Sequence, residues 1–228
     1  MEIFYIKKEE HIAGTVAWEM RWRKSSVHSN STSLNGASVN YMADGTTDPF
    51  VLKKWKTIFR RLFDNSSSQE ADWGDFYLIT KRVGSLYGAD SEQMTLTRNT
   101  MKPLWNKLVA LTDINNDKKI QLTEWCELLK QSSLNPKVEN DWINEYMEFM
   151  FKLFDVSCDG KLDLPEFVDG MKTCGLDEES AREAFKLMTK NEDDCTISYD
   201  RFTSLWREYF FSSDREALGN HLFGELPD

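Results

Sequence analysis

Apolar residues recur at helical spacing through most of the chain that follows residue 48. In VLKKWKTIFRRLF, residues 51–63, one face carries Leu52, Trp55, Ile58, Phe59, Leu62 and Phe63. This is the repeat of an amphipathic helix, and it recurs in residues 100–112, 141–154 and 178–189. Asp48 and Pro49 suit the N-cap and the first position of the earliest helix. Because we identify no long alternation of apolar and polar residues, we expect an all-α chain with only very short strands.

A polar stretch of about twelve residues follows each helical segment, and an apolar or aromatic residue comes next, which makes an internal repeat. We number these stretches loops 1 to 4; they span residues 64–75, 113–124, 155–166 and 190–201. Four copies in one chain allow their candidate ligand positions to be compared directly.

Loop 3, DVSCDGKLDLPE, places oxygen atoms where a hard divalent cation such as calcium needs them. Such an ion takes about six to eight oxygen ligands. Gly160 permits the left-handed turn that wraps the chain around the ion, and Leu162 fills an apolar position at which a neighbouring loop pairs by a short strand. Glu166, on the first turn of the next helix, can give both carboxylate oxygens. The predicted ligands are Asp155, Ser157, Asp159, the backbone carbonyl of Lys161, Asp163 (directly or through water) and Glu166.

Loop 2, DINNDKKIQLTE, repeats this arrangement with one departure. Its predicted ligands are Asp113, Asn115, Asp117, the backbone carbonyl of Lys119, Gln121 and Glu124. Lys118 stands where glycine is expected, and a left-handed backbone costs a non-glycine residue roughly 1–2 kcal/mol. If only the bound state carries that strain, affinity falls about tenfold. We therefore predict a weaker calcium site.

Loop 1, DNSSSQEADWGD, keeps Asp64 and Asp75 at its ends but loses most ligands between them. Ser66 and Ser68 replace carboxylates, and Gln69 replaces the glycine. The shorter reach of a terminal aspartate disfavours bidentate coordination. We expect a structural loop without a bound ion.

Loop 4, KNEDDCTISYDR, carries Lys190 and Arg201 at its first and last ligand positions. A unit positive charge roughly 4 Å from a divalent cation costs about 8 kcal/mol at an effective dielectric constant of 20, so calcium should not bind. Ile197 can still pair with Leu162 of loop 3. We expect Lys190 and Arg201 to neutralise the loop's own acids, which are Glu192, Asp193 and Asp194.

These loops and the sequence around them resemble the EF-hand superfamily, in particular the sarcoplasmic calcium-binding proteins and their calexcitin and luciferin-binding relatives. The resemblance is carried by residues 153–188 and 205–224 and by DWGDF at 72–76, and it extends over roughly 50–224. It implies four EF-hands in two pairs, hands 1 and 2 in residues 48–134 and hands 3 and 4 in residues 135–228. Family members bind Ca2+ with Mg2+ in competition, so the resemblance implies a calcium buffer or sensor.

Residues 1–47 have no counterpart in that family, and we predict a flexible N-terminal arm. The stretch 24–40 is polar, rich in serine and asparagine, and without periodicity. MRWRK, residues 20–24, interleaves a tryptophan with basic residues. We expect a short frayed helix there, with a docking patch for a partner as the alternative.

Composition narrows the remaining possibilities. The formal net charge of −10 argues against nucleic-acid binding and suits cation binding, although acidic surfaces also serve solubility. No apolar run approaches the roughly 18 residues of a transmembrane helix, and the N-terminus lacks the pattern of a signal peptide. We therefore expect a cytoplasmic monomer. Four cysteines without CxxC spacing predict buried or half-buried thiols.

Three functions stay open at this stage. The first is a calcium-binding protein that uses loops 2 and 3. The second is a calcium-independent adaptor that holds a protein partner through the N-terminal arm. The third is carriage of an apolar small molecule, which eight tryptophans and fourteen phenylalanines would suit, although filling the core explains those aromatic residues more simply. No nucleophile, acid–base pair or phosphate loop indicates an enzyme.

Overall fold

The computed structural model describes residues 2–10, 16–24, 47–64, 68–134, 141–190 and 194–226, with the backbone alone for the first two ranges and for Asp141. The chain divides into two units, residues 1–36 and 37–228. No helix in the described ranges is long and apolar enough to cross a membrane.

The first unit contains an antiparallel hairpin. Strand β1 (Glu2–Glu10) pairs with β2 (Val16–Lys24), with Glu2 opposite Lys24. The helix predicted for residues 20–24 is therefore wrong, and so is the expectation that all strands are very short. The overlooked signal is the alternation of Val16, Trp18, Met20 and Trp22 with smaller or charged residues. Residues 1, 11–15 and 25–46 of the predicted arm lie outside the described ranges.

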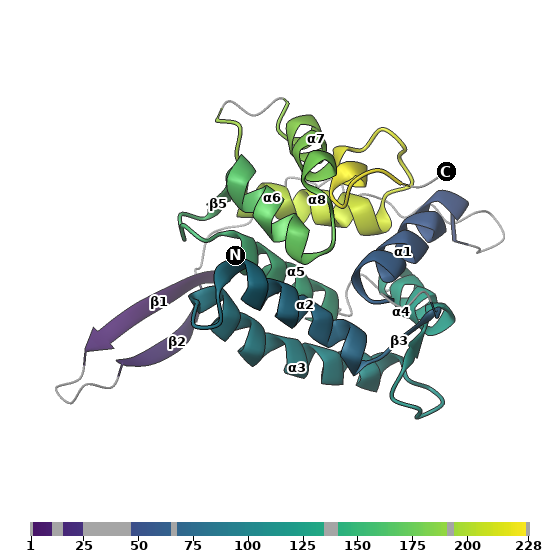
Figure 1. Cartoon of the computed structure of the whole chain (residues 1–228), viewed down its shortest axis with the longest axis horizontal. Coiled ribbons are helices and arrows are strands. Elements are labelled where there is room, and N and C mark those ends of the chain that lie inside the picture. Colours follow the sequence, from purple (N-terminus) through teal and green to yellow (C-terminus); the bar gives the residue numbers. More distant parts are fainter. Residues whose placement is uncertain are drawn as a thin grey trace. The chain divides into compact units, whose positions relative to one another are not determined.

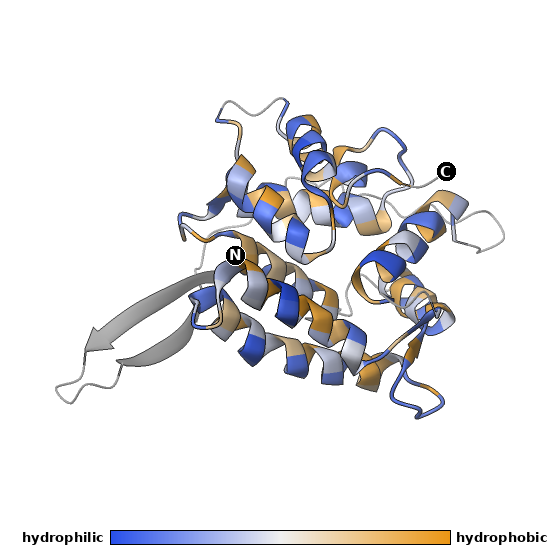
Figure 2. Cartoon of the chain, in the orientation of Figure 1, coloured by the Kyte–Doolittle hydropathy of each residue, from blue (hydrophilic) through white to orange (hydrophobic). Residues whose placement is uncertain are grey.

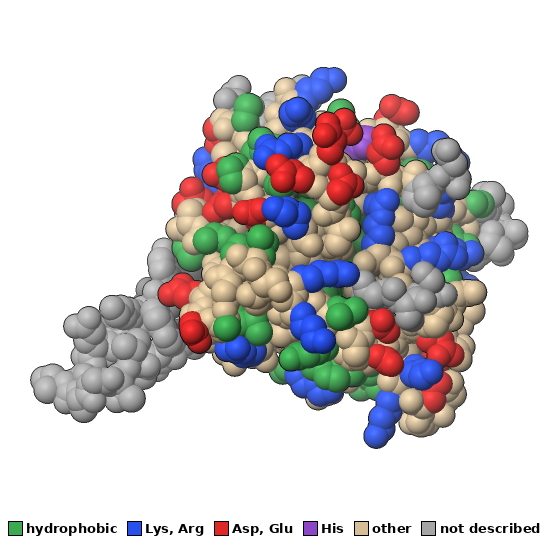
Figure 3. All heavy atoms as spheres, viewed as in Figure 1, with side chains coloured by type: hydrophobic (Ala, Val, Ile, Leu, Met, Phe, Trp, Pro, Cys, Tyr) green, Lys and Arg blue, Asp and Glu red, His purple; other side chains and the backbone are tan. Residues whose placement is uncertain are grey.

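In its described ranges the second unit consists mainly of helices, with paired two-residue strands in the loops, as predicted (Figure 1). Its helices are α1 (Pro49–Leu62), α2 (Trp73–Tyr87), α3 (Glu92–Thr112), α4 (Leu122–Leu134), α5 (Asp141–Phe154), α6 (Leu164–Thr173), α7 (Glu178–Met188), α8 (Tyr199–Phe211) and the 3-10 helix η1 (Leu218–His221). Figure 2 shows apolar and polar residues alternating around these helices, as amphipathic helices require. Figure 3 shows basic and acidic side chains interspersed over the same face of the molecule.

The helix boundaries follow their capping residues. The carboxylate of Asp48 accepts a hydrogen bond from the Phe50 backbone N–H at 2.7 Å, and Pro49 begins α1 as predicted. Helix α3 begins at Glu92, eight residues before the predicted segment 100–112, because the hydroxyl of Ser91 caps the Met94 amide. Pro103 lies inside this helix, so proline does not end it.

Short strands join the loops in two antiparallel pairs. Strand β3 (Glu70–Ala71) pairs with β4 (Ile120–Gln121), which joins loop 1 to loop 2. Strand β5 (Lys161–Leu162) pairs with β6 (Ile197–Ser198), which joins loop 3 to loop 4. The predicted contact between Leu162 and Ile197 is confirmed as a register pair.

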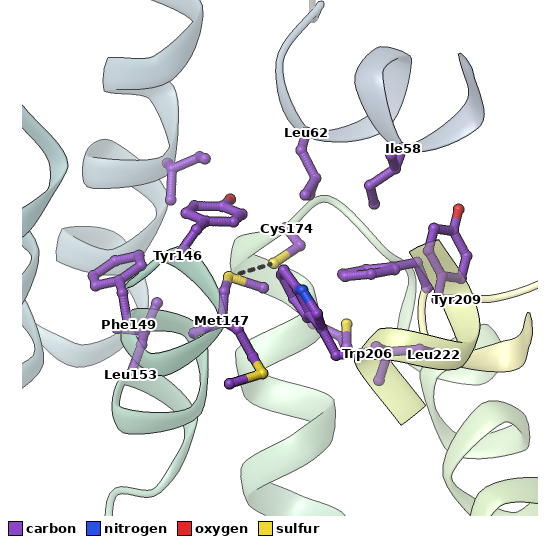
Figure 4. Packing of buried hydrophobic residues seen from close by; sticks show 14 of the residues in the cluster. Ile58, Leu62, Tyr146, Met147, Phe149, Leu153, Cys174, Trp206, Tyr209 and Leu222 are labelled. Carbon is purple, nitrogen blue, oxygen red and sulfur yellow. Dashed lines mark hydrogen bonds between the residues drawn. The ribbon is translucent and has the colours of Figure 1, made fainter. Parts of the chain in front are cut away.

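Helix α5 packs its aromatic residues against helices of both loop pairs. The indole of Trp142 meets that of Trp125 edge-on, with ring centroids 5.8 Å apart, and stacks on Tyr146 at 5.2 Å. The ring centroid of Tyr146 in turn lies 6.0 Å from that of Trp206 in α8. Figure 4 shows both residues in a close-up of the core. The Trp142 N–H also donates to the Leu104 carbonyl of α3 at 2.8 Å. The predicted core methionines, Met147, Met150, Met171 and Met188, are all buried here.

A buried lysine connects α1 to the C-terminal segment. Lys54 is fully buried, and its ammonium donates to the carbonyls of Glu208 and Ser212 and to the side-chain oxygen of Asn220, at 3.0, 2.7 and 3.0 Å. Two helical turns later, Arg61 donates to the carbonyls of Phe223 and Glu225. Two cations of α1 thus hold the chain that follows α8.

The cysteines match the prediction only in part. The four are thiols and form no disulfide with one another; Cys174 is buried and Cys126 half-buried, but Cys158 and Cys195 are exposed. The two exposed thiols lie in loops 3 and 4, where the chain turns with positive φ (59° and 51°). Burial raises the pKa of the Cys126 thiol to about 11 and that of the Cys174 thiol to about 12.

Candidate metal centre

Loop 3 is closed by its own backbone amides. The two carboxylate oxygens of Asp155 accept from the N–H groups of Asp159 and Gly160, at 3.2 and 3.1 Å. The carboxylate of Glu166 accepts from Ser157 at 2.8 Å and from Asp163 at 3.2 Å. Because the first and last predicted ligands are both tied to loop amides, the loop is held in a compact turn.

Further hydrogen bonds orient the middle of loop 3. The side chain of Asp159 accepts from the Lys161 amide at 2.8 Å, and the side chain of Asp163 accepts from the Glu166 amide at 2.9 Å. The second contact completes a capping box at the start of α6. Gly160 adopts φ of +81°, so the left-handed turn predicted for this residue is confirmed.

Loop 2 repeats the network of loop 3 almost contact for contact. Asp113 accepts from the amides of Asp117 and Lys118 at 3.2 and 2.9 Å, and Asp117 accepts from the Lys119 amide at 2.8 Å. Glu124 accepts from the amides of Ile114 and Gln121, at 3.2 and 3.0 Å. Asn115 adds a hydrogen bond from its amide nitrogen to Asp117 at 2.8 Å.

The sixth position has a left-handed backbone in all four loops. Lys118 has φ of 61°, Gln69 of 65° and Cys195 of 51°, beside Gly160 in loop 3. The strain expected at Lys118 is therefore present in loop 2, and non-glycine residues carry it in loops 1 and 4 as well. The common turn confirms that the four stretches were aligned in the correct register.

Loop 1 retains the closure at its first residue. Asp64 is buried, and its carboxylate accepts from the amides of Ser68 and Gln69, both at 2.8 Å. Asp75 accepts from the Asp72 amide at 3.1 Å in a capping box at the start of α2. Ser66, a predicted replacement ligand, lies outside the described residues. The shape of the loop thus persists where its ligand chemistry is reduced.

In loop 4, Asp194 contacts a cation of loop 3. Its carboxylate pairs with the ammonium of Lys161, on loop 3, at 2.6 Å. The hydrogen bond from Lys161 and those from Thr196 lower the pKa of Asp194 to about 2. Lys161 is therefore an ion-pair partner of Asp194. Neutralisation of the loop's acids by Lys190 and Arg201 stays a prediction, because Glu192 and Asp193 lie outside the described residues.

A similar ion pair joins loops 1 and 2. The Lys119 ammonium lies 2.7 Å from the Glu70 carboxylate, and the hydrogen bond and charge of Glu70 raise the pKa of Lys119. Sequence reasoning missed both cross-loop pairs. Opposite charges in paired loops are a signal for such pairs, but only the folded structure shows which residues meet.

The predicted ligands are side chains and carbonyls that offer oxygen atoms, and those of loop 3 are exposed or half-buried. This donor chemistry fits a hard cation such as Ca2+. Within the described ranges, no three His, Cys, Asp or Glu side chains lie close enough together to enclose a metal ion as they stand. Convergence of the twelve predicted ligands on two ions therefore stays a prediction, and it requires side-chain rotation.

Comparison with known proteins places this architecture among calcium-binding proteins. No family model matches the chain. Calexcitin-1 of Caenorhabditis elegans is 40% identical over 180 residues, which cover 78% of this chain and 87% of the relative. Sarcoplasmic calcium-binding proteins I, III and IV of Branchiostoma lanceolatum are 27% identical over 186 residues, covering 78% and 98%.

Solved structures share the fold. The sarcoplasmic calcium-binding protein of amphioxus superposes with a TM-score of 0.63 at 23% identity, over 79% of this chain and 99% of that one. The coelenterazine-binding protein of Renilla muelleri, in its calcium-loaded form, gives a TM-score of 0.59 at 22% identity, over 78% and 96%. The chain therefore belongs to the EF-hand calcium-binding family that includes calexcitin and the sarcoplasmic calcium-binding proteins, and Ca2+ is the ligand of that family.

Proposed function

We propose that the chain binds two calcium ions, one in loop 2 and one in loop 3, with loops 1 and 4 as partners that bind none. The observation that carries this proposal is the network common to loops 2 and 3. In each, the first aspartate accepts from the fifth and sixth amides, and the last glutamate accepts from the ninth amide and from one near the start of the loop. The ligands are Asp113, Asn115, Asp117, Lys119, Gln121 and Glu124 in loop 2, and Asp155, Ser157, Asp159, Lys161, Asp163 and Glu166 in loop 3.

Loop 3 is the tighter site of the two. It has glycine at the strained sixth position, where loop 2 has Lys118, and it has aspartate at the ninth position, where loop 2 has the uncharged Gln121. A higher ligand charge and a less strained turn both favour the divalent ion. Mg2+ competes for both loops, since they offer it the same hard oxygen donors.

The experiment is calorimetric titration of the full chain with calcium, with and without magnesium. We expect a stoichiometry of two, falling to one in Glu166→Gln with loss of the tighter site and to one in Glu124→Gln with loss of the weaker site. Glu145→Gln, an equal charge change on the exposed face of α5, is the control and should still bind two ions. A stoichiometry of zero or four would contradict the proposal.

We further propose that the chain buffers calcium in the cytosol as a monomer and is not a calcium-opened sensor. A sensor exposes an apolar groove when calcium binds. Here the apolar faces of the two loop pairs already meet at buried Trp142, whose N–H is bonded to the Leu104 carbonyl. Opening the groove would expose that contact. A fluorescent probe of apolar surface should therefore respond little to calcium, whereas a large calcium-dependent increase would indicate a sensor.

A second candidate is an adaptor that holds a protein partner through the N-terminal hairpin. An isolated two-stranded hairpin is marginally stable in water, and among the described residues no third strand pairs with β1 or β2. A strand from a partner could complete the sheet. Deletion of residues 1–47 would then abolish retention of the partner and leave calcium affinity unchanged. Equal retention by the truncated and full-length chains would exclude this function.

A further inference from the structure

The lysine at the seventh position of each proposed calcium loop pairs with a carboxylate of the neighbouring, inactive loop. Lys119 of loop 2 meets Glu70 of loop 1 at 2.7 Å, and Lys161 of loop 3 meets Asp194 of loop 4 at 2.6 Å. All four side chains are between about a third and a half exposed. The same contact therefore occurs once in each loop pair, in both cases from the loop expected to bind calcium to the loop expected to bind none.

The two contacts are not one contact copied by the internal repeat. Glu70 is the seventh residue of loop 1, whereas Asp194 is the fifth residue of loop 4. Glu70 lies in β3, in register with Gln121, and Asp194 lies before β6, where Ser198 is in register with Lys161. Two different backbone positions thus deliver a carboxylate to the equivalent lysine, although loops 1 and 4 have lost other acidic ligands.

The lysine at the seventh position has two groups that act on the ion in opposite ways. Its backbone carbonyl is the predicted ligand, while its side chain ends in a positive charge that repels a divalent cation. A carboxylate at ion-pair distance offsets that repulsion and holds the side chain on the side of the inactive loop. The amide of the same residue is held by Asp117 in loop 2 and by Asp159 in loop 3, both at 2.8 Å. The residue is therefore held at its amide and at its side chain, the two groups that share an α-carbon with the ligand carbonyl.

We propose that Glu70 and Asp194 are positioning residues through which each inactive loop sets the calcium affinity of its partner: Glu70 acts on loop 2 through Lys119, and Asp194 acts on loop 3 through Lys161. The inference rests on the proposed calcium sites in loops 2 and 3. Exposed ion pairs contribute little to stability, so the effect is a graded change of affinity and not loss of the fold.

Single-site backgrounds separate the two loops in the test. The Glu166→Gln chain reports calcium binding at loop 2 alone, and the Glu124→Gln chain reports loop 3 alone. In the first background, Glu70→Gln should weaken calcium binding by about three- to tenfold, the size expected for one nearby charge screened by water, and Asp194→Asn should change it less than about twofold. In the second background the two variants should exchange roles. Glu145→Gln removes one carboxylate from an exposed ion pair of similar length, with Lys107 at 2.8 Å, and should leave both affinities unchanged.

A double-mutant cycle distinguishes positioning from a general loss of structure. Once Lys119 is replaced by glutamine, no ammonium is left to neutralise, so Glu70→Gln should no longer weaken loop 2. The same holds for Asp194→Asn after Lys161→Gln in loop 3. A merely structural role would give additive losses, and additive losses would overturn the inference.

The outcomes also separate this inference from the proposed function. Background chains that bind calcium with affinities unmoved by Glu70→Gln and Asp194→Asn overturn the positioning role and leave the two sites intact. Background chains that bind no calcium overturn both proposals together. If each variant weakens calcium binding only at the partner loop, and has no effect once the lysine is replaced, both proposals are supported.

Discussion

Gly170 of α6 lies against the ring of Phe154, the last residue of α5, so closely that a β-carbon on the glycine would overlap the ring atoms. Both residues are buried, and Phe154 immediately precedes the first predicted ligand of loop 3. The two helices that flank loop 3 therefore approach each other at a point that only glycine allows.

Replacing Gly170 with alanine should push α5 and α6 apart. Overpacking of this kind costs about 1–3 kcal/mol, and displacement of Phe154 should also weaken calcium binding at loop 3. Urea unfolding and calcium titration of the Glu124→Gln background measure the two effects. The control is Gly84→Ala in α2, where the nearest atom to the new β-carbon is the Met94 sulfur at 3.5 Å. That variant should be neutral or slightly stabilised, because alanine favours helix. Equal stability of the two variants would contradict the argument.

Replacing Lys118 with glycine should strengthen the weaker calcium site. Lys118 holds φ of 61°, which costs a side chain with a β-carbon roughly 1–2 kcal/mol. If calcium binding imposes that conformation, glycine should tighten loop 2 by up to about tenfold. Titration of the Glu166→Gln background measures the change. Gly160→Lys in the Glu124→Gln background is the matching reverse substitution, and it should weaken loop 3 by a similar factor. If neither substitution shifts affinity, the free loop already bears the strain.

Much of the fold follows from the sequence because its signals are local. The α5 boundaries agree residue for residue with the apolar repeat at 141–154, and the loop register follows from the position of the apolar residue that pairs in each short strand. The early start of α3 was missed because its first turns, at Glu92 and beyond, are dominated by polar residues. The residues that this part of the helix buries are only Met94, Thr97 and Met101, too few and too polar to show an apolar repeat in the sequence.

The contacts that could not be predicted depend on which segments meet in space. Glu70 and Asp194 occupy different positions of their loops, so no alignment of the four loops shows that both reach the same lysine position. The burial of Lys54 is equally hidden, since its position in KKWK beside Lys53 and Lys56 suggests an exposed basic turn. Only the docking of the segment after α8 encloses it.

Replacing Trp142 with phenylalanine should destabilise the protein more than the same change at Trp206. Both indoles are buried, with 1% of each exposed. The N–H of Trp142 donates to the Leu104 carbonyl at 2.8 Å, whereas that of Trp206 has no hydrogen-bond partner among the described residues. Phenylalanine at 142 removes this buried hydrogen bond, while the Leu104 carbonyl keeps its bond within α3, so the variant should lose about 0.5–1.5 kcal/mol beyond the lost volume.

Trp206→Phe removes a buried N–H that has no hydrogen-bond partner among the described residues, so this variant should lose only the packing volume of the indole. Urea unfolding of the two variants, at the same calcium concentration, gives the difference. A larger loss for Trp206→Phe would show that the Trp142 hydrogen bond contributes little, or that the indole of Trp206 has a partner in solution.

Lys54 should make stability rise with pH. Burial lowers the pKa of its ammonium to about 8, against smaller opposing effects of Glu208, Asp48 and Asp214, while an unfolded lysine titrates near 10.4. Below pH 8 both states hold the proton, and the cost of burying the charge is fully present. Between about pH 8 and 10.4 the unfolded chain binds more protons than the folded one, so the free energy of unfolding increases with pH, by up to about 3 kcal/mol.

The Lys54→Met variant isolates this contribution, because methionine cannot titrate and fills a similar volume. At pH 7 it should be less stable than the wild type by about 1–3 kcal/mol, since the carbonyls of Glu208 and Ser212 and the side chain of Asn220 lose their donor. The deficit should widen as pH rises from 8 to 10. Urea unfolding at fixed excess calcium measures both proteins over this range. Lys53→Met, on the neighbouring half-buried lysine, should stay parallel to the wild type. A deficit for Lys54→Met that is constant with pH would show that Lys54 keeps its proton throughout, and that the hydrogen bonds to the C-terminal segment outweigh the cost of burial.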